Sequence, residues 1–154
     1  MPAMTAVPSP GCSSRPRVLP IMLHEIHRMR ILLIDDEPTA RLHLRILLEQ
    51  RGPIEEAPDA LAGLQRIRDA IAEGPPFDLV CIDLSMPGPD GIEALKMMQE
   101  VDRTLRDGKH TNVVVVTASD DQLDIRAALH QHVDGYLLKP VTPGQILETI
   151  DPLD

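Results

Sequence analysis

One pattern constrains the fold of this chain more than any other feature: a short strand-like run followed by a segment with helical spacing, five times over residues 30–150. Four of the runs are mainly apolar and lie at residues 30–34, 77–82, 113–116 and 135–138, whereas residues 54–57 form a weaker strand signal. Strands that are apolar along most of their length are typical of a parallel sheet buried on both faces. With right-handed crossovers, the pattern predicts a doubly wound α/β fold with five parallel strands.

The segments between the runs predict the helices. After the first run, one helical face carries Ala40, Leu44, Leu47 and Leu48. Pro38 suits the first turn of this helix, and Gly52-Pro53 predicts its end. Similar spacing predicts helices after Asp59, from about Gly91, around residues 125–129 and over residues 143–150.

Residues 1–28 differ from the rest. Five of the 15 prolines fall there, which predicts a flexible Pro-rich N-terminal tail ahead of one folded domain at residues 29–154. Translation from Met22 or Met29 is an alternative to a start at Met1. The tail carries three arginines and one glutamate, or +2, so the folded part carries −11, and the two add up to the formal net charge of −9.

This charge and the scarcity of aromatic residues exclude one class of function. The chain has one Tyr, one Phe and no Trp, so bases have almost no aromatic surface on which to stack. An acidic domain would also repel a phosphate backbone, and we therefore expect no direct nucleic-acid partner. The chain has no apolar run of membrane-spanning length and only two, widely separated cysteines, so we expect a cytoplasmic protein with no membrane partner.

Polar side chains follow four of the predicted strands. Asp35 and Asp36 follow the first, Asp83 the third, Thr117 the fourth and Lys139 the fifth. In a doubly wound sheet these strand ends meet at one edge, where ligands bind. Two like charges 4 Å apart repel by roughly 4 kcal/mol at an effective dielectric of 20, so three carboxylates require counter-charges. Lys139 supplies one, and a divalent cation is expected to supply the rest.

Oxygen-only ligands favour a hard ion such as Mg²⁺. Such a site permits one carboxylate to attack a phosphoryl group and form an aspartyl phosphate. Mg²⁺ and Lys139 would neutralise charge on the phosphoryl oxygens, and Thr117 would donate a hydrogen bond to one of them.

Four sequence pieces occur in a recognisable order: Asp35-Asp36, Asp83-Leu-Ser-Met-Pro-Gly-Pro-Asp-Gly91, Thr117-Ala118 and Tyr136-Leu-Leu-Lys139-Pro140. Together they resemble the receiver domain of two-component response regulators, of the chemotaxis-regulator type, over about residues 30–150. The resemblance implies a flavodoxin-like fold with strand order 2-1-3-4-5. It also implies a phosphorylation-dependent signalling switch that assists its own Mg²⁺-dependent phosphorylation and dephosphorylation but is not an enzyme.

The resemblance implies a role for each site residue. Asp83 would accept a phosphoryl group from a phosphohistidine of a histidine kinase or phosphotransfer protein. Asp35, Asp36, Asp83 and the backbone carbonyl of Ser85 would bind Mg²⁺.

Lys139 would contact the phosphoryl oxygens, and its bond to Pro140 would be cis. Thr117 and Tyr136 would act as the switch. Their movement would alter partner binding at the face formed by the fourth helix, the fifth strand and the fifth helix.

Three alternatives are weighed against this interpretation. An aspartate-nucleophile phosphatase would need an acid two residues after the nucleophile, where this chain has Ser85. A phosphorylation-independent pseudo-receiver is disfavoured because all five site positions are filled. The chain could also be the receiver fragment of a longer regulator, so the downstream partner is either a separate effector or an output domain.

Several other residues are interpreted as structural. Asp59, Asp90 and Asp120 are expected to be helix caps or turn formers. Cys81, Met97 and Met98 are expected to lie in the core.

Overall fold

The computed structural model describes residues 28–84, 95–101, 111–118 and 133–153. Five strands form one parallel sheet in the order β2-β1-β3-β4-β5, which confirms the predicted fold class and strand order. The strands are β1 (Ile31–Ile34), β2 (Ile54–Ala57), β3 (Leu79–Ile82), β4 (Asn112–Thr117) and β5 (Gly135–Leu138).

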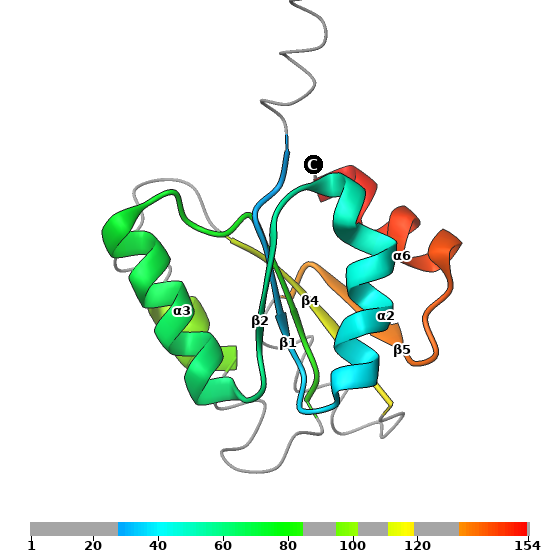
Figure 1. The fold of residues 1–154 in the computed structure, drawn as a ribbon, viewed down its shortest axis with the longest axis horizontal. Helices are drawn as coiled ribbons and strands as arrows, with labels where there is room; N and C mark the ends of the chain where they lie inside the picture. Colours follow the sequence, from blue (N-terminus) through cyan, green and yellow to red (C-terminus); the bar gives the residue numbers. More distant parts are fainter. Residues whose placement is uncertain (1–27, 85–94, 102–110, 119–132, 154) are drawn as a thin grey trace, which may run out of the picture.

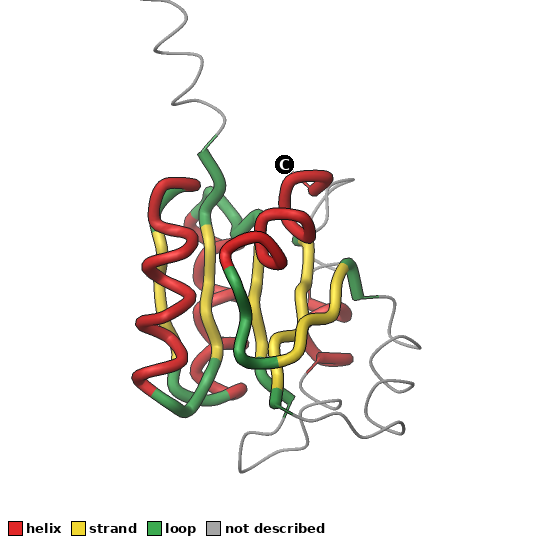
Figure 2. Tube along the Cα trace, turned by 90° about the vertical axis from the view of Figure 1, so that its right-hand side faces the viewer, coloured by secondary structure: helices red, strands yellow, loops and turns green. Residues whose placement is uncertain are grey.

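Helices cover both faces of this sheet (Figure 1). They are α2 (Pro38–Leu48) with the 3-10 turn η2 (Glu49–Arg51), α3 (Ala60–Glu73), and α6 (Pro143–Ile150) with the 3-10 turn η3 (Asp151–Leu153). Residues 95–101 are also helical. α2 and α6 lie on one face, α3 and residues 95–101 lie on the other, and the quarter-turn view in Figure 2 shows the strands between these layers.

The inner strands β1 and β3 are apolar at every position because alternate side chains enter two separate cores. Leu32 and Ile34 of β1 pack in the cluster that includes α3, whereas Ile31 and Leu33 pack in the cluster that includes α2 and α6. All four β1 side chains are at most 1% exposed. The two clusters pack against the two faces of the sheet and so fix the positions of the strand ends.

Helix ends largely follow the sequence signals. Asp59 is the N-cap of α3 and accepts a hydrogen bond from the backbone N–H of Ala62, as predicted. Thr142 and Gln145 form a capping box at the start of α6. The prediction for Met97 is wrong: Met98 is buried, but Met97 lies on the solvent-facing side of the same helix and is 37% exposed.

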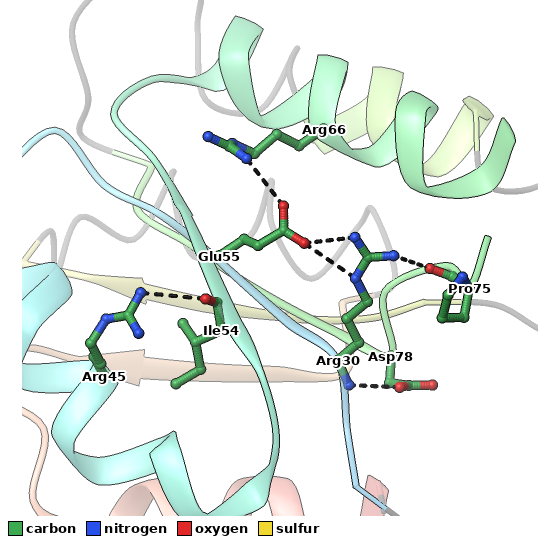
Figure 3. A network of polar contacts seen from close by, with 7 residues as sticks. All are labelled: Arg30, Arg45, Ile54, Glu55, Arg66, Pro75 and Asp78. Atoms are coloured by element: carbon green, nitrogen blue, oxygen red, sulfur yellow. Dashed lines mark hydrogen bonds and ion pairs between the residues drawn. The ribbon is translucent and has the colours of Figure 1, made fainter. Parts of the chain in front are cut away.

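Ion pairs hold the edge strand β2 to its neighbours (Figure 3). Glu55 accepts hydrogen bonds from both Nε and Nη2 of Arg30, at 3.2 and 2.6 Å, and pairs with Arg66 of α3 at 3.1 Å. The Arg30 guanidinium also lies over the Phe77 ring, 4.5 Å from its centroid. The sequence of β2 is only weakly strand-like, so these contacts contribute to its placement at the sheet edge.

Some predictions lie outside the described residues. They concern the N-terminal tail up to residue 27, the helix around residues 125–129, the first turn of the helix from Gly91, and the proposed caps Asp90 and Asp120.

Candidate functional site

Strand register brings Asp35 and Asp83 together. Ile34 of β1 pairs with Ile82 of β3. Asp35 follows Ile34 directly in sequence, and Asp83 follows Ile82 directly. The backbone N–H of Asp83 donates to the Ile34 carbonyl at 3.0 Å, so the ladder continues up to the site. Asp35 is 2% exposed and Asp83 is 3% exposed, which is rare for carboxylates unless they are paired.

Lys139 provides the pairing charge. Its Nζ lies 2.6 Å from Oδ2 of Asp35 and 3.0 Å from Oδ2 of Asp83. Partial burial opposes the charge on this lysine, but hydrogen bonds and charge from the two aspartates outweigh that effect and raise the pKa of Lys139 above its ordinary value. One ammonium therefore bridges the two buried carboxylates. The Lys139–Pro140 peptide bond is cis, in agreement with the prediction.

The structure also defines the surroundings of the two predicted switch residues. Thr117 is the last residue of β4, is fully buried, and pairs with Leu138 directly before Lys139. Its carbonyl accepts a hydrogen bond from the Lys139 backbone N–H at 2.9 Å. Tyr136 lies on β5, is partly buried, and packs against the core on the α3 side of the sheet.

A candidate metal site lies at the same edge. Asp35, Asp36 and Asp83 each offer a carboxylate oxygen, and these oxygens lie within 4.8 Å of one another. Asp36 is exposed, whereas the other two are buried. Three carboxylates and one ammonium leave two negative charges uncompensated, so the donor set fits a hard divalent cation. Ser85, whose backbone carbonyl was predicted as a further ligand, lies outside the described residues.

Sequence reasoning missed a residue that braces the site. Arg41 of α2 donates through Nη1 to the Asp35 carbonyl and pairs through Nε with Oε1 of Glu56 at 2.8 Å. Arg45 pairs with the other oxygen of Glu56 at 2.7 Å. The position of Arg41 one turn into a helix is a weak signal, because its partner Glu56 is distant in sequence and on another element.

These residues form a defined chemical environment. Two buried carboxylates with an ammonium between them, beside the exposed carboxylate of Asp36, could hold a divalent ion and present an oxygen to an electrophile. The ammonium and the ion can stabilise negative charge that develops on that electrophile. None of the helices within the described part of the chain is long and apolar enough to cross a membrane.

Comparison with known proteins gives a consistent family assignment. The sequence model described as "Response regulator receiver domain" matches residues 31–151. The nitrate/nitrite response regulator protein homolog of Haemophilus influenzae is 32% identical over 123 residues, covering 80% of this chain and 55% of that protein. Chemotaxis protein CheY-3 of Vibrio cholerae is 34% identical over 127 residues, covering 81% of this chain and 91% of that protein.

Solved structures agree with this assignment. A CheY-like response regulator receiver domain protein from Methanospirillum hungatei superposes with a TM-score of 0.68 at 27% identity, covering 82% of this chain and 94% of that one. The chain spans about half the length of the nitrate/nitrite regulators that it matches, 55% for the Haemophilus protein and 52% for NarL of Escherichia coli.

Proposed function

Because this chain belongs to the response regulator receiver domain family of two-component signalling, we propose that it is a phosphorylation-dependent switch whose phosphoacceptor is Asp83. One observation carries the proposal. The ammonium of Lys139 bridges Asp83 and Asp35 at the carboxyl ends of β3 and β1, next to a cluster of three carboxylates. Membership of this family would account for three carboxylates at one edge of the sheet despite their mutual electrostatic repulsion.

Asp83 is suited to act as the nucleophile. Lys139 stabilises its ionised form, so no general base is needed to remove a proton before attack. In the proposed reaction, a carboxylate oxygen of Asp83 forms a bond to phosphorus, and the bond from phosphorus to the donor's leaving atom breaks. The leaving atom, a phosphohistidine nitrogen in the signalling reaction, keeps the electron pair. Lys139 and Thr117 would stabilise charge on the phosphoryl oxygens.

Asp35, Asp36 and Asp83 would hold the divalent cation, with Ser85 as a further proposed ligand. Mg²⁺ bound there would neutralise phosphoryl charge and orient the transferred group. Asp35 has a second task within the chain. Its Oδ1 accepts a hydrogen bond from the Glu37 backbone N–H at 3.0 Å, and this fixes the turn that leads into α2.

We further propose that the response to phosphorylation reaches β5 and α6. Thr117 and Leu138 are paired at the end of β4 and β5, so a shift of Thr117 would be felt along β5, where Tyr136 lies. Leu138 of β5 and Leu147 of α6 are 43% and 37% exposed, so each of these two elements has apolar surface that a partner could contact. The segment predicted to complete this face, around residues 125–129, lies outside the described residues.

The proposed partners are a histidine kinase or phosphotransfer protein upstream, and an effector protein or an output domain downstream. The nitrate/nitrite regulators that the chain matches are about twice as long as the matched part, which supports the output-domain alternative. CheY-3 of Vibrio cholerae, of which the chain covers 91%, supports the alternative of a separate effector.

Incubation with a small acyl phosphate tests the proposal against a phosphorylation-independent pseudo-receiver. With Mg²⁺ present, we expect the intact mass to increase by one phosphoryl group, and we expect no increase when a chelator removes the ion. A mass that stays unchanged with Mg²⁺ and excess donor would instead support the pseudo-receiver.

A further inference from the structure

The segment that joins β5 to α6 begins with Lys139 and is anchored at both ends. The backbone N–H of Lys139 donates to the Thr117 carbonyl at 2.9 Å, which ties the segment to β4. At its other end, Oγ1 of Thr142 accepts from the Gln145 backbone N–H at 3.2 Å and caps α6. The position of the Lys139 ammonium therefore depends on how firmly the two residues between these anchors are held.

A cavity of about 230 Å³ lies between this segment and α2. Its walls include Thr39, Ala40 and His43 of α2 and, opposite, Lys139, Pro140 and Val141. Val141 packs in the same core cluster as Leu44 and Leu48 of α2, whereas the cavity leaves unfilled space beside Lys139 and Pro140. Packing beside these two residues is therefore incomplete, and a hydrogen bond can add to their restraint.

His43 links the two walls. Its Nε2 lies 2.8 Å from the carbonyl oxygen of Val141, two residues after Lys139. A carbonyl oxygen can only accept, so Nε2 carries the hydrogen and donates it. The Val141 side chain is 3% exposed and packs in the core on the α2 and α6 side of the sheet. The bond from His43 therefore acts on a backbone whose own side chain is already fixed in the core.

We propose that His43 is a positioning residue for Lys139, and that its bond to Val141 holds the segment so that the ammonium stays between Asp35 and Asp83. α2 starts two residues after Asp36, so the bond joins the element that follows the acidic pair to the segment that carries the cation. This inference rests on the proposed function, because the consequence of positioning Lys139 is measured as the rate of phosphoryl transfer to Asp83.

Three variants of α2 separate positioning from general structure. His43→Leu removes the donor, His43→Gln keeps an N–H donor on a side chain of similar reach, and Ile46→Ala changes an exposed residue one turn further along the helix. The readout is the maximal rate of phosphorylation by acetyl phosphate at saturating Mg²⁺, followed by intact mass. A small donor removes any effect of α2 on docking of a protein donor.

We expect His43→Leu to lower the maximal rate by about threefold to tenfold, the consequence of losing one hydrogen bond that orders a transition-state contact. His43→Gln should stay within about twofold of wild type, and Ile46→Ala should not change the rate. The apparent Mg²⁺ affinity of His43→Leu should be unchanged or tighter, since a displaced ammonium repels the ion less. General loosening of the site would instead weaken Mg²⁺ binding together with the rate.

The outcomes distinguish this inference from the proposed function. If wild type gains no phosphoryl group, the proposed function fails. If wild type is phosphorylated and His43→Leu reacts at the same rate, or His43→Gln is as slow as His43→Leu, or Mg²⁺ affinity falls in parallel with the rate, then only the role of His43 is overturned.

Discussion

The Lys139 ammonium lies 2.6 Å from Oδ2 of Asp35, although 104 residues separate the two in sequence. The same nitrogen lies 3.0 Å from Oδ2 of Asp83. Two carboxylates that are almost fully buried thus share one cation. Breaking such a pair leaves an uncompensated buried charge, which costs more than the pair contributes when it is intact.

Replacement of Lys139 should therefore leave the carboxylates of Asp35 and Asp83 without their compensating charge. We expect Lys139→Met to lower the free energy of unfolding by about 2–4 kcal/mol in the absence of divalent ions. Mg²⁺ should then stabilise the variant more than wild type, because the ion no longer meets an ammonium at the site. Urea unfolding with and without Mg²⁺ measures both effects. Lys96→Met is the control, since Lys96 is exposed; equal Mg²⁺ stabilisation of Lys139→Met and wild type would contradict the account.

The pH dependence of this pair has a defined sign. The pKa of Lys139 is raised in the folded chain, so its pairing with the ionised carboxylates contributes its full stability from neutral pH up to the unfolded pKa of about 10.4. This contribution is lost as pH rises through the folded pKa. The stability difference between wild type and Lys139→Met should accordingly stay constant near neutral pH and shrink only in alkaline solution.

Glu56 should show the opposite pH dependence. Burial alone would raise the pKa of Glu56, but hydrogen bonds and charge from Arg45 and Arg41 outweigh it and lower the pKa below the ordinary value of 4.5. Its contribution is therefore present above pH 4.5 and is lost as pH falls through the folded pKa. Because the pair is partly exposed, Glu56→Gln should cost at most about 1 kcal/mol at pH 7.

Chemical denaturation across pH 3–7 checks this expectation, with Glu73→Gln as a control at an exposed glutamate. A Glu56→Gln effect that persists undiminished at the acid end would show that the carboxylate charge is not its source.

Thr117→Ala should separate phosphorylation from the response to it. Asp83 and Lys139 are untouched, so the variant should still accept the phosphoryl group. Loss of one hydrogen bond of about 1 kcal/mol would shift a two-state ratio by about fivefold and weaken the response. Tyr136 is the single tyrosine of a chain without tryptophan, so its fluorescence reports on β5 directly.

We expect the fluorescence change on phosphorylation to be smaller in Thr117→Ala than in wild type, and Thr117→Ser to restore it because it keeps the hydroxyl. An unaltered change in Thr117→Ala would remove Thr117 from the switch.

Gly52 is required where the chain enters β2. A Cβ there would lie 1.8 Å from the carbonyl oxygen of Met29, and the backbone has φ of +154°. Backbone atoms cannot yield as a side chain can, so Gly52→Ala should lower the free energy of unfolding by about 3 kcal/mol or more. Gly144→Ala in α6 meets nothing within 4 Å and should be neutral or slightly stabilising. Equal stability of the two variants would contradict the structure.

The parallel sheet was predictable because four of its strands have strong apolar patterns, whereas Ile54–Ala57 is weakly strand-like and the strand order followed from the resemblance to receiver domains. The predicted runs at Ile54–Ala57 and Gly135–Leu138 became strands with those bounds, and the run at residues 30–34 became β1 at Ile31–Ile34, one residue shorter. Parallel pairing then brings strand ends to one edge whatever the details of the loops, so Asp35, Asp83 and Lys139 could be grouped from their positions alone.

Contacts that depend on a side chain reaching a distant backbone could not be predicted. The bond from His43 to the Val141 carbonyl joins residues 98 positions apart, and its formation depends on the path of the segment after Lys139. Arg41 and Glu56 meet only because β2 lies at the sheet edge beside α2. Met97 is exposed because the buried face of its helix follows the spacing of Leu95, Met98 and Val101, and the apolar character of a side chain does not by itself place it on that face.

The central claim is that Asp83 receives the phosphoryl group, and intact-mass measurement of matched variants tests it most directly. Wild type, Asp83→Asn and Asp69→Asn are incubated with a small acyl phosphate and Mg²⁺. Asp69→Asn is the control, because it removes the same charge at an exposed position of α3. We predict a gain of one phosphoryl group in wild type and Asp69→Asn and none in Asp83→Asn. The same gain in Asp83→Asn would contradict the account.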